Sequence, residues 1–292
     1  MVKYIINIFN MLLLYTFCCD IGRHSKDTLI KVLNILLNSI HKNIVNYKIL
    51  CFTNFKNELT DKISEKYNIE FREYYDKQVV DIYKDKWLNL SFNKINVYKS
   101  LYDEFNSDFC WIDLDTIVCH DISYINNMPC MFIDCGGTDK HPHKLIDENN
   151  DPSIPRNKWI QGNLWKLNID LYNKLMKIYQ KFSSENKKFH YDLQGLFTYY
   201  FYFVLDGDKK TLLDNNIFIP GRNTKQNALY GLSVWNLKGN THANIDGLKN
   251  LYYDNEILKS KFYPTKDIHI LSFTFNTLRQ LYNKNEFKIF SM

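Results

Sequence analysis

The sequence predicts an α/β protein, a single domain in which a mixed, mostly parallel central sheet is flanked by helices. Strand-like apolar runs alternate with helical patterns along the first 120 residues, as they do in βαβ units. The chain of 292 residues is 45% hydrophobic and 16% aromatic, which is enough for one large core without disulfide support. A third observation is a pair of carboxylates beside an apolar strand, because ligands of open α/β sheets bind at the carboxyl ends of strands.

The first half of the chain supplies most of the regular pattern. Ser25 is a suitable N-cap for a helix whose apolar residues, from Leu29 to Leu37, recur at helical spacing. The turn sequence Asp20-Ile21-Gly22 separates this helix from the strand before it. We expect strands at residues 12–18, 47–53, 69–75 and 110–118, and helices at residues 25–40, 59–67 and 92–105.

The second half is less regular, and its most polar part, residues 136–158, holds three of the six prolines. A loop of this length is unusual unless it has a function, so we expect a flexible segment that covers a bound ligand. We expect strands at residues 130–135, 159–167, 217–220, 251–253 and 268–275, a helix at residues 171–182, and a helix or buried aromatic segment at residues 191–204.

Charge and cysteine usage exclude some partners and compartments. The net charge of +5 is mild and the lysines are scattered, so we expect no nucleic-acid partner. The seven cysteines include no CxxC pair, which favours buried free thiols and a reducing, cytoplasmic compartment. Asn7 and Asn10 interrupt the apolar N-terminus, so we expect a first strand there rather than a signal peptide or transmembrane anchor. The oligomeric state is left open.

The most informative segment is FCWIDLDTIV, residues 109–118, in which Asp113 and Asp115 stand one residue apart in an apolar strand. A buried carboxylate without a partner is costly, so a cation is expected beside them. Carboxylate oxygens suit Mg²⁺ or Mn²⁺ shared with a substrate diphosphate. The alternative is that both aspartates cap a turn and face solvent, since a D-x-D pattern is common by chance.

This segment, with the helix before it, resembles the GT-A fold glycosyltransferases of the D-x-D type, such as the glycogenin-like and galactosyltransferase-like groups. The resemblance follows the order of elements over most of the chain, and it is specific only at FNKI, residues 92–95, and at Asp113-Leu114-Asp115. It implies that Asp115 binds the metal ion and that Asp113 reaches the sugar and ribose of the donor, with Leu114 between them. Lys94 matches a family residue that presents a basic group to the donor, although a solvated helix lysine is the alternative.

Two further matches to the family concern the donor and the metal ion. The end of the first strand, with Thr16, Phe17, Cys18 and Asp20, stands where family members hold the base and ribose. DIHI, residues 267–270, stands where a C-terminal histidine completes the metal shell, which implies His269 as a ligand. The usual Gly and Lys after that histidine are replaced by LSFT, so a packed strand histidine is the alternative.

The acceptor side of the resemblance is carried by two segments. WIQGNLW, residues 159–165, resembles the strand that lines the acceptor, which implies roles for Asn163 and Trp165. YDLQGL, residues 191–196, resembles the family's "D-Q" helix start with one inserted residue, which implies that Asp192 is the catalytic carboxylate and Gln194 its neighbour. A helix N-cap is the alternative for Asp192, and a core position is the alternative for Trp165.

As a whole, the resemblance implies a metal-dependent glycosyltransferase with a nucleotide-sugar-binding half at residues 1–120 and an acceptor half at residues 121–292. The expected donor is a UDP-sugar, and the acceptor is a hydroxyl of a glycan, protein or lipid. Two other classes stay open: a haloacid dehalogenase-like phosphatase, in which Asp113 is the nucleophile, and a catalytically inactive carbohydrate-binding protein. The phosphatase family expects Thr or Val four residues after that nucleophile, where Ile117 stands here.

Overall fold

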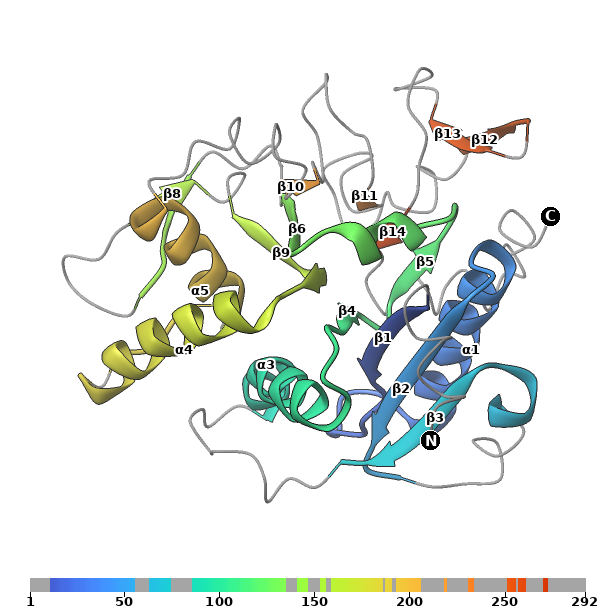
Figure 1. Cartoon of the computed structure of the whole chain (residues 1–292), viewed down its shortest axis with the longest axis horizontal. Helices are drawn as coiled ribbons and strands as arrows, with labels where there is room; N and C mark the ends of the chain where they lie inside the picture. The colour runs from blue at the N-terminus through green and yellow to red at the C-terminus, as the bar shows by residue number, and fades with distance from the viewer. Residues whose placement is uncertain are drawn as a thin grey trace. The chain divides into compact units, whose positions relative to one another are not determined.

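The computed structural model confirms the predicted fold class, an α/β fold with a mixed, mostly parallel central sheet flanked by helices (Figure 1). It describes residues 11–55, 63–74, 86–134, 141–146, 153–155, 159–185, 187–190, 193–205, 218–219, 231–233, 251–255, 257–260 and 270–272. The strands of the main sheet follow the order β10-β6-β9-β4-β1-β2-β3.

The helices and strands fall close to the predicted ranges. The helices are α1 (Lys26–Asn43), α3 (Lys86–Phe105), α4 (Ile169–Ser184) and α5 (Leu193–Tyr199), with a 3-10 turn η4 (Ser123–Asn127) and a π-helical turn η6 (Tyr200–Val204). The strands of the main sheet are β10 (Phe218–Ile219), β6 (Met131–Asp134), β9 (Ile160–Lys166), β4 (Cys110–Ile112), β1 (Leu12–Phe17), β2 (Tyr47–Thr53) and β3 (Ile69–Glu73). Smaller sheets join β11 (Gly231–Ser233), β14 (Ile270–Ser272) and β5 (Thr116–Val118), then β12 (Leu251–Asp254) and β13 (Ile257–Ser260), and β7 (Pro142–Lys144) and β8 (Ser153–Pro155).

Within the described part of the chain, two compact units interleave along the sequence. The first unit takes residues 1–74, 112–127 and 225–292, and the second takes residues 75–111 and 128–224. The units therefore do not divide at one point of the sequence.

In the first unit, the parallel strands β1, β2 and β3 (blue to cyan in Figure 1) form the main layer. Leu14 pairs with Ile49, which pairs with Ile69 on its other side. All six residues of β1 are buried, as expected for a strand covered on both faces. Helix α1 begins at the predicted N-cap, Ser25, whose side chain accepts a hydrogen bond from the Thr28 N–H.

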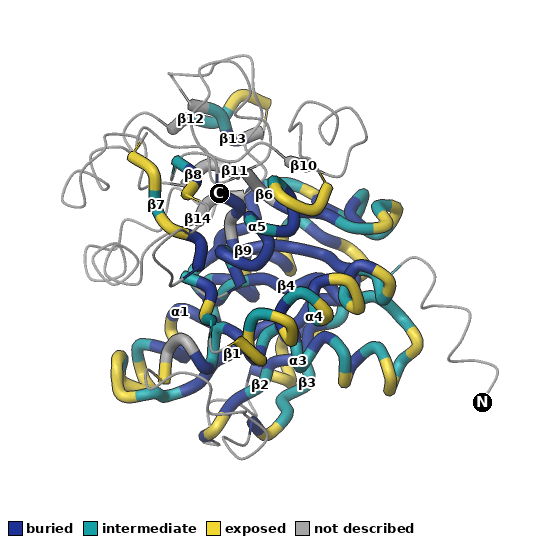
Figure 2. Tube along the Cα trace, turned by 90° about the vertical axis from the view of Figure 1, so that its left-hand side faces the viewer, coloured by how far each residue is buried: buried dark blue, intermediate teal, exposed yellow. Residues whose placement is uncertain are grey.

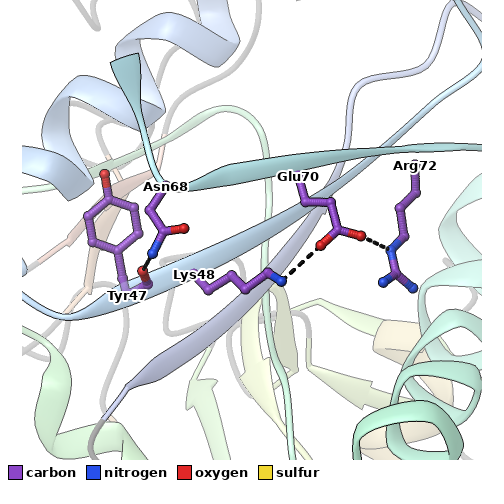
Figure 3. Close-up of polar contacts among 5 residues, drawn as sticks. All are labelled: Tyr47, Lys48, Asn68, Glu70 and Arg72. Atoms are coloured by element: carbon purple, nitrogen blue, oxygen red, sulfur yellow. Dashed lines mark hydrogen bonds and ion pairs between the residues drawn. The ribbon is translucent and has the colours of Figure 1, made fainter. Parts of the chain in front are cut away.

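The end strand of the main sheet order, β3, is charged. Glu70 accepts hydrogen bonds from Lys48 on β2 and from Arg72 on β3, both at 2.8 Å (Figure 3). Burial raises the pKa of Glu70, but the hydrogen bonds from Lys48 and Arg72 outweigh it, so the pKa lies below its ordinary value. Charged side chains on an end strand discourage pairing with another chain, which is sufficient reason for this cluster.

The predicted strand at residues 110–118 is two strands in different sheets, so this prediction is wrong in its continuity. β4 belongs to the main sheet, the chain turns at Leu114 and Asp115, and β5 belongs to the small sheet with β14 and β11. The physical reason is that a continuous buried strand would take two carboxylates out of water, whereas the turn leaves both of them half-buried.

In the second unit, β6 pairs antiparallel with β9 and parallel with β10. Strand β9 is buried from Gly162 to Lys166 and is dark blue in Figure 2. The helices α3 and α4 meet at Phe92 and Tyr179, whose ring centroids are 4.1 Å apart. The aromatic segment predicted at residues 191–204 forms α5 and η6.

The segment at residues 136–158, predicted as a flexible loop, contains two paired strands in its described parts, so the prediction of a loop is wrong there, while its flexibility stays a prediction. β7 pairs antiparallel with β8, and Leu145, Ile146 and Ile154 are buried. The N–H of His190 donates to the carbonyl of Leu145 at 2.9 Å. These three apolar side chains pack into the core, although the composition of the segment as a whole is polar. That the segment covers a ligand stays a prediction.

Two further features of the described residues bear on the sequence analysis. No disulfide joins the described cysteines, and all of them except Cys130 are buried: Cys18, Cys19, Cys51, Cys110, Cys119 and Cys130. Among the described helices, none has the length and apolar character that a membrane span requires.

Candidate active site

The carboxylate turn, residues 113–115, lies in the first unit between β4 and β5. Asp113 and Asp115 are half-buried and flank Leu114, which is buried and holds the turn against the core. The hydroxyl of Thr116, the next residue, is also buried and has no hydrogen-bond partner among the described residues. A buried hydroxyl without a partner is usually satisfied by a bound water, ion or ligand. The Thr116 hydroxyl and the two carboxylates beside it are oxygen ligands of the kind that bind divalent cations.

Side chains of α1 hold the strand that follows the turn. The Val118 N–H donates to the hydroxyl of Ser39 at 3.0 Å, and the Asn43 side-chain amide donates to the Val118 carbonyl at 2.9 Å. The Ser39 hydroxyl in turn donates to the carbonyl of Leu36 at 2.7 Å. The N–H and the carbonyl of Val118 are thus both hydrogen-bonded to side chains of α1. These bonds fix the position of β5, which directly follows the carboxylate turn.

On its other edge β5 pairs antiparallel with β14. Ser272 lies opposite Thr116, and Ile270 lies opposite Val118. Asp115 therefore adjoins the carboxyl end of β14, whereas His269 directly precedes the amino end of that strand in the sequence. His269 lies outside the described residues, and its role as a metal ligand stays a prediction. No cluster of three metal-binding side chains is found in the described ranges.

The predicted donor residues at the end of β1 differ in accessibility. Thr16, Phe17 and Cys18 are buried, and the ring of Phe17 packs against Phe52 at 5.9 Å between centroids. Asp20 is half-buried, and its carboxylate accepts a hydrogen bond from the Gly22 N–H at 2.9 Å. Of these four residues, Asp20 has the most accessible side chain, and the buried Thr16 hydroxyl has no hydrogen-bond partner among the described residues. That the four residues bind the donor stays a prediction.

The same turn is tied to the end of β2. Asn54 accepts a hydrogen bond from the Asp20 N–H and donates one to the Asp20 carbonyl, both at 2.8 Å. Gly22 has a φ of 84°, a left-handed conformation that favours glycine. The ends of β1 and β2 are thereby joined at the edge of the sheet where ligands of such folds bind.

In the second unit, Lys94 lies on α3 with its ammonium 4.5 Å from the centroid of the Trp111 ring. This cation–π contact positions Lys94 beside the residue that stands two before Asp113 in the sequence. Lys94 is half-buried and so is not the fully solvated helix lysine of the alternative interpretation.

Trp165 is a core residue, so its predicted stacking against an acceptor sugar is corrected. The residue is 0% exposed, and its ring stacks on Trp111 with centroids 6.3 Å apart and meets Phe197 edge-on at 5.6 Å. A sugar could reach this ring only by displacing both aromatic neighbours. Sequence alone could not distinguish the two roles, because an indole suits a core and a sugar face equally well.

The side chain of Gln194 lies against β9, and its role at the acceptor stays a prediction. A Cβ atom on Gly162 would lie 3.3 Å from the Gln194 side chain, so the glycine lets this side chain rest on the strand. Asn163, the next residue of β9, is buried. The hydroxyl of Thr198 accepts from the Ile160 N–H at 3.0 Å and donates to the Gln194 carbonyl at 2.6 Å, which fastens α5 to β9.

Asp192 lies outside the described residues, which resume at Leu193, the first residue of α5. A Cβ atom on Gly195 would lie 2.3 Å from the carbonyl oxygen of His190, so only glycine fits this approach of the backbone to the helix. Gly195 was not predicted as a constrained position. A glycine two residues before the aromatic run that begins at Phe197 could have indicated a close backbone contact. The role of Asp192 stays a prediction.

The second unit contains a cluster of buried ionisable groups that was not predicted from the sequence. Lys166 on β9 is 6% exposed and donates to the Met128 carbonyl at 2.8 Å. Burial lowers the pKa of Lys166. Burial also raises the pKa of Asp108, although Tyr98, which donates to this carboxylate at 2.9 Å, and the charge of Lys166 oppose the shift. A lysine at the end of an apolar strand was the signal that could have found it.

Comparison with known proteins supports the fold and leaves the activity to inference. No protein-family model matches the sequence, and no curated protein matches it. A solved structure described as an apo WbbM bifunctional glycosyltransferase is similar over 90% of this chain, with a TM-score of 0.52 and 12% identity. The chain spans 45% of the length of that structure. At this identity the likeness shows that the chain shares the fold of a glycosyltransferase.

Proposed function

We propose that this protein is a glycosyltransferase that moves a sugar from a nucleotide-diphosphate sugar, most simply a UDP-sugar, to an acceptor hydroxyl. The observation that carries the proposal is the half-buried carboxylate turn between β4 and β5, in a fold that is also the fold of a solved glycosyltransferase. The similarity alone would not carry it, because folds host many activities and the site decides among them.

The carboxylates fit a divalent cation by their donor chemistry. Asp113 and Asp115 supply hard oxygen ligands, and they leave positions for the oxygens of a diphosphate. His269, the third ligand that the resemblance implies, stays a separate proposal, because the next residue, Ile270, pairs with Val118, three positions after Asp115. A bound Mg²⁺ or Mn²⁺ would stabilise the negative charge that develops on the departing nucleoside diphosphate.

The protein's own residues would bind and orient the two substrates. Asp20, at the joined ends of β1 and β2, can accept hydrogen bonds from ribose hydroxyls. Lys94, held by Trp111, can offset charge on the donor phosphates. Gln194 can hydrogen-bond sugar hydroxyls from its place on β9. Asp192 would act on the acceptor hydroxyl or stabilise the reacting sugar, depending on the stereochemical course.

The proposal is tested by release of UDP from a panel of UDP-sugars with Mn²⁺ or Mg²⁺. Asp115→Asn keeps the side-chain volume but removes the charge that would hold the cation, so we expect turnover to fall by orders of magnitude with little change in Tm. Asp27→Asn, an equal change at an exposed position of the same unit, is the matched control.

Two outcomes would contradict the proposal. One is wild-type turnover that survives thorough chelation, and the other is Asp115→Asn activity equal to that of Asp27→Asn. Release of phosphate from simple phosphomonoesters, with no release of UDP, would instead indicate a phosphatase.

A further inference from the structure

The second unit holds a cavity of about 260 Å³ that none of the predicted site residues lines. Its walls come from β6, the start of β9, the first turns of α4, and α5 with η6. The apolar lining is Phe132, Ile160, Leu171, Phe197, Phe201 and Leu205, joined by Cys130 and Tyr200, and the polar lining is Asn168, Asp170 and Lys174.

The π-helical turn η6 connects this cavity to the surface. The Leu205 N–H donates to the Tyr200 carbonyl at 3.0 Å, the five-residue step of a π-helix. Such turns recur at functional sites. Tyr200 and Phe201 line the cavity and are buried, whereas Leu205 lines it and is 48% exposed. Phe203 and Val204, also in η6, are further exposed apolar side chains.

Among the described residues that line the cavity, the two charged at neutral pH, Asp170 and Lys174, are exposed, and the others carry no charge. Burial raises the pKa of the Cys130 thiol to about 11, although the charge of Lys166 opposes the shift. Burial also raises the pKa of Tyr200. Both groups therefore stay protonated, and the walls offer hydrocarbon contacts with no site for a buried ion.

Two exposed side chains of opposite charge, Lys174 and Asp170, stand at the rim, and two further lysines lie beyond it on α4. Lys174 is exposed, and Lys177 and Lys181 follow it at helical spacing on α4, also exposed. Asp170, one turn before Lys174, is the opposing charge at the rim. Asn168 caps α4, so the partly positive end of a 16-residue helix also lies there.

We propose that this cavity binds an alkyl chain that carries an anionic head group, with the chain in the cavity and the head group at Lys174. The ligand could arrive as a dissolved amphiphile or be presented by a membrane surface, and both share this chemistry. The proposal is independent of glycosyl transfer and of the carboxylate turn.

Calorimetric titration with n-alkyl phosphates below their critical micelle concentrations tests it. Each added methylene should tighten binding about fourfold until the chain fills the cavity, after which the gain should stop. Lys174→Gln should weaken binding by up to about fivefold, and Asp170→Asn should tighten it by a similar factor. An n-alkanol of equal length, which has no charge, should respond to neither change.

Control variants separate the cavity from general surface effects. Leu205→Ser removes apolar wall at the rim and should weaken the phosphate and the alkanol alike. Val45→Ser and Lys31→Gln make equal changes at exposed positions of the first unit and should alter neither affinity. The inactive Asp115→Asn protein should bind normally, so failure here and failure of the proposed transferase activity are distinguishable.

Three results would overturn the proposal. The first is no saturable binding of any alkyl phosphate, and the second is an equal response to Lys174→Gln and Asp170→Asn. The third is binding to vesicles of phosphatidylcholine and phosphatidylglycerol without binding of the monomeric amphiphile, which would indicate surface adsorption. Vesicle binding that Leu205→Ser removes, alongside monomer binding, would identify a membrane lipid as the source.

Discussion

Removing the Ser39 hydroxyl is expected to destabilise the protein, because it holds the strand that leaves the carboxylate turn. Ser39 is 8% exposed, and in Ser39→Ala the Val118 N–H loses its acceptor 3.0 Å away in a place that water does not reach readily. The Leu36 carbonyl, to which Ser39 donates, lies inside α1 and is less affected. An unsatisfied buried N–H costs about 1–3 kcal/mol, so we expect a loss of about 2 kcal/mol in the free energy of unfolding.

Urea denaturation followed by tryptophan fluorescence measures this loss. Ser100→Ala is the matched control, because Ser100 is exposed and its hydroxyl only meets a carbonyl of its own helix at 3.4 Å. The control should stay within about 0.5 kcal/mol of wild type. If β5 positions the turn, Ser39→Ala should also weaken the stabilisation by UDP and Mn²⁺. A Ser39→Ala protein as stable as the control would refute the reasoning.

Three other variants test separate parts of the structure. Asp192→Asn preserves a helix cap, so turnover that falls by orders of magnitude at constant Tm indicates catalysis, whereas near-normal turnover indicates a cap. Gly195→Ala forces a Cβ atom against the His190 carbonyl oxygen and should cost about 3 kcal/mol or more in urea denaturation; a cost below about 1 kcal/mol would contradict the close approach of these two segments. The pKa of Lys166 is lowered in the folded state, so just below the ordinary lysine pKa the folded protein binds fewer protons than the unfolded protein. The contribution of Lys166 to the free energy of unfolding therefore increases as pH rises. The stability of wild type relative to Lys166→Met should therefore increase from about pH 8 to about pH 10, and a constant difference would show that Lys166 is not desolvated.

The parts of the fold that follow from local pattern were predictable from the sequence. The N-cap Ser25, the buried face of α1 and the strand at 47–53 all result from side-chain spacing and capping chemistry within one element. The turn after β1 was readable for the same reason, because Asp20 and Gly22 make their hydrogen bond over two residues.

The parts that depend on distant segments were not predictable in this way. The two aspartates favour a turn after β4, but they do not indicate which strand the next segment joins, because Thr116–Val118 pairs with β14, more than 150 residues later. Trp165 is buried because Trp111 and Phe197 enclose it, and both are far from it in sequence. The cavity that η6 helps to line likewise combines five elements, and each of them contributes side chains that are ordinary in its own sequence context.

The donor and acceptor predictions rest on different residues and can be tested separately. Asp20, Asp113 and Asp115 belong to the first unit, whereas Lys94, Gln194 and Asp192 belong to the second. If the proposed roles are correct, Asp115→Asn should remove the thermal stabilisation that UDP and Mn²⁺ provide, because it alters the donor side. Asp192→Asn should retain that stabilisation and lose transfer. A loss of nucleotide binding in both variants would mean that the second-unit carboxylate also serves the donor, and the assignment of Asp192 to the acceptor would then fail.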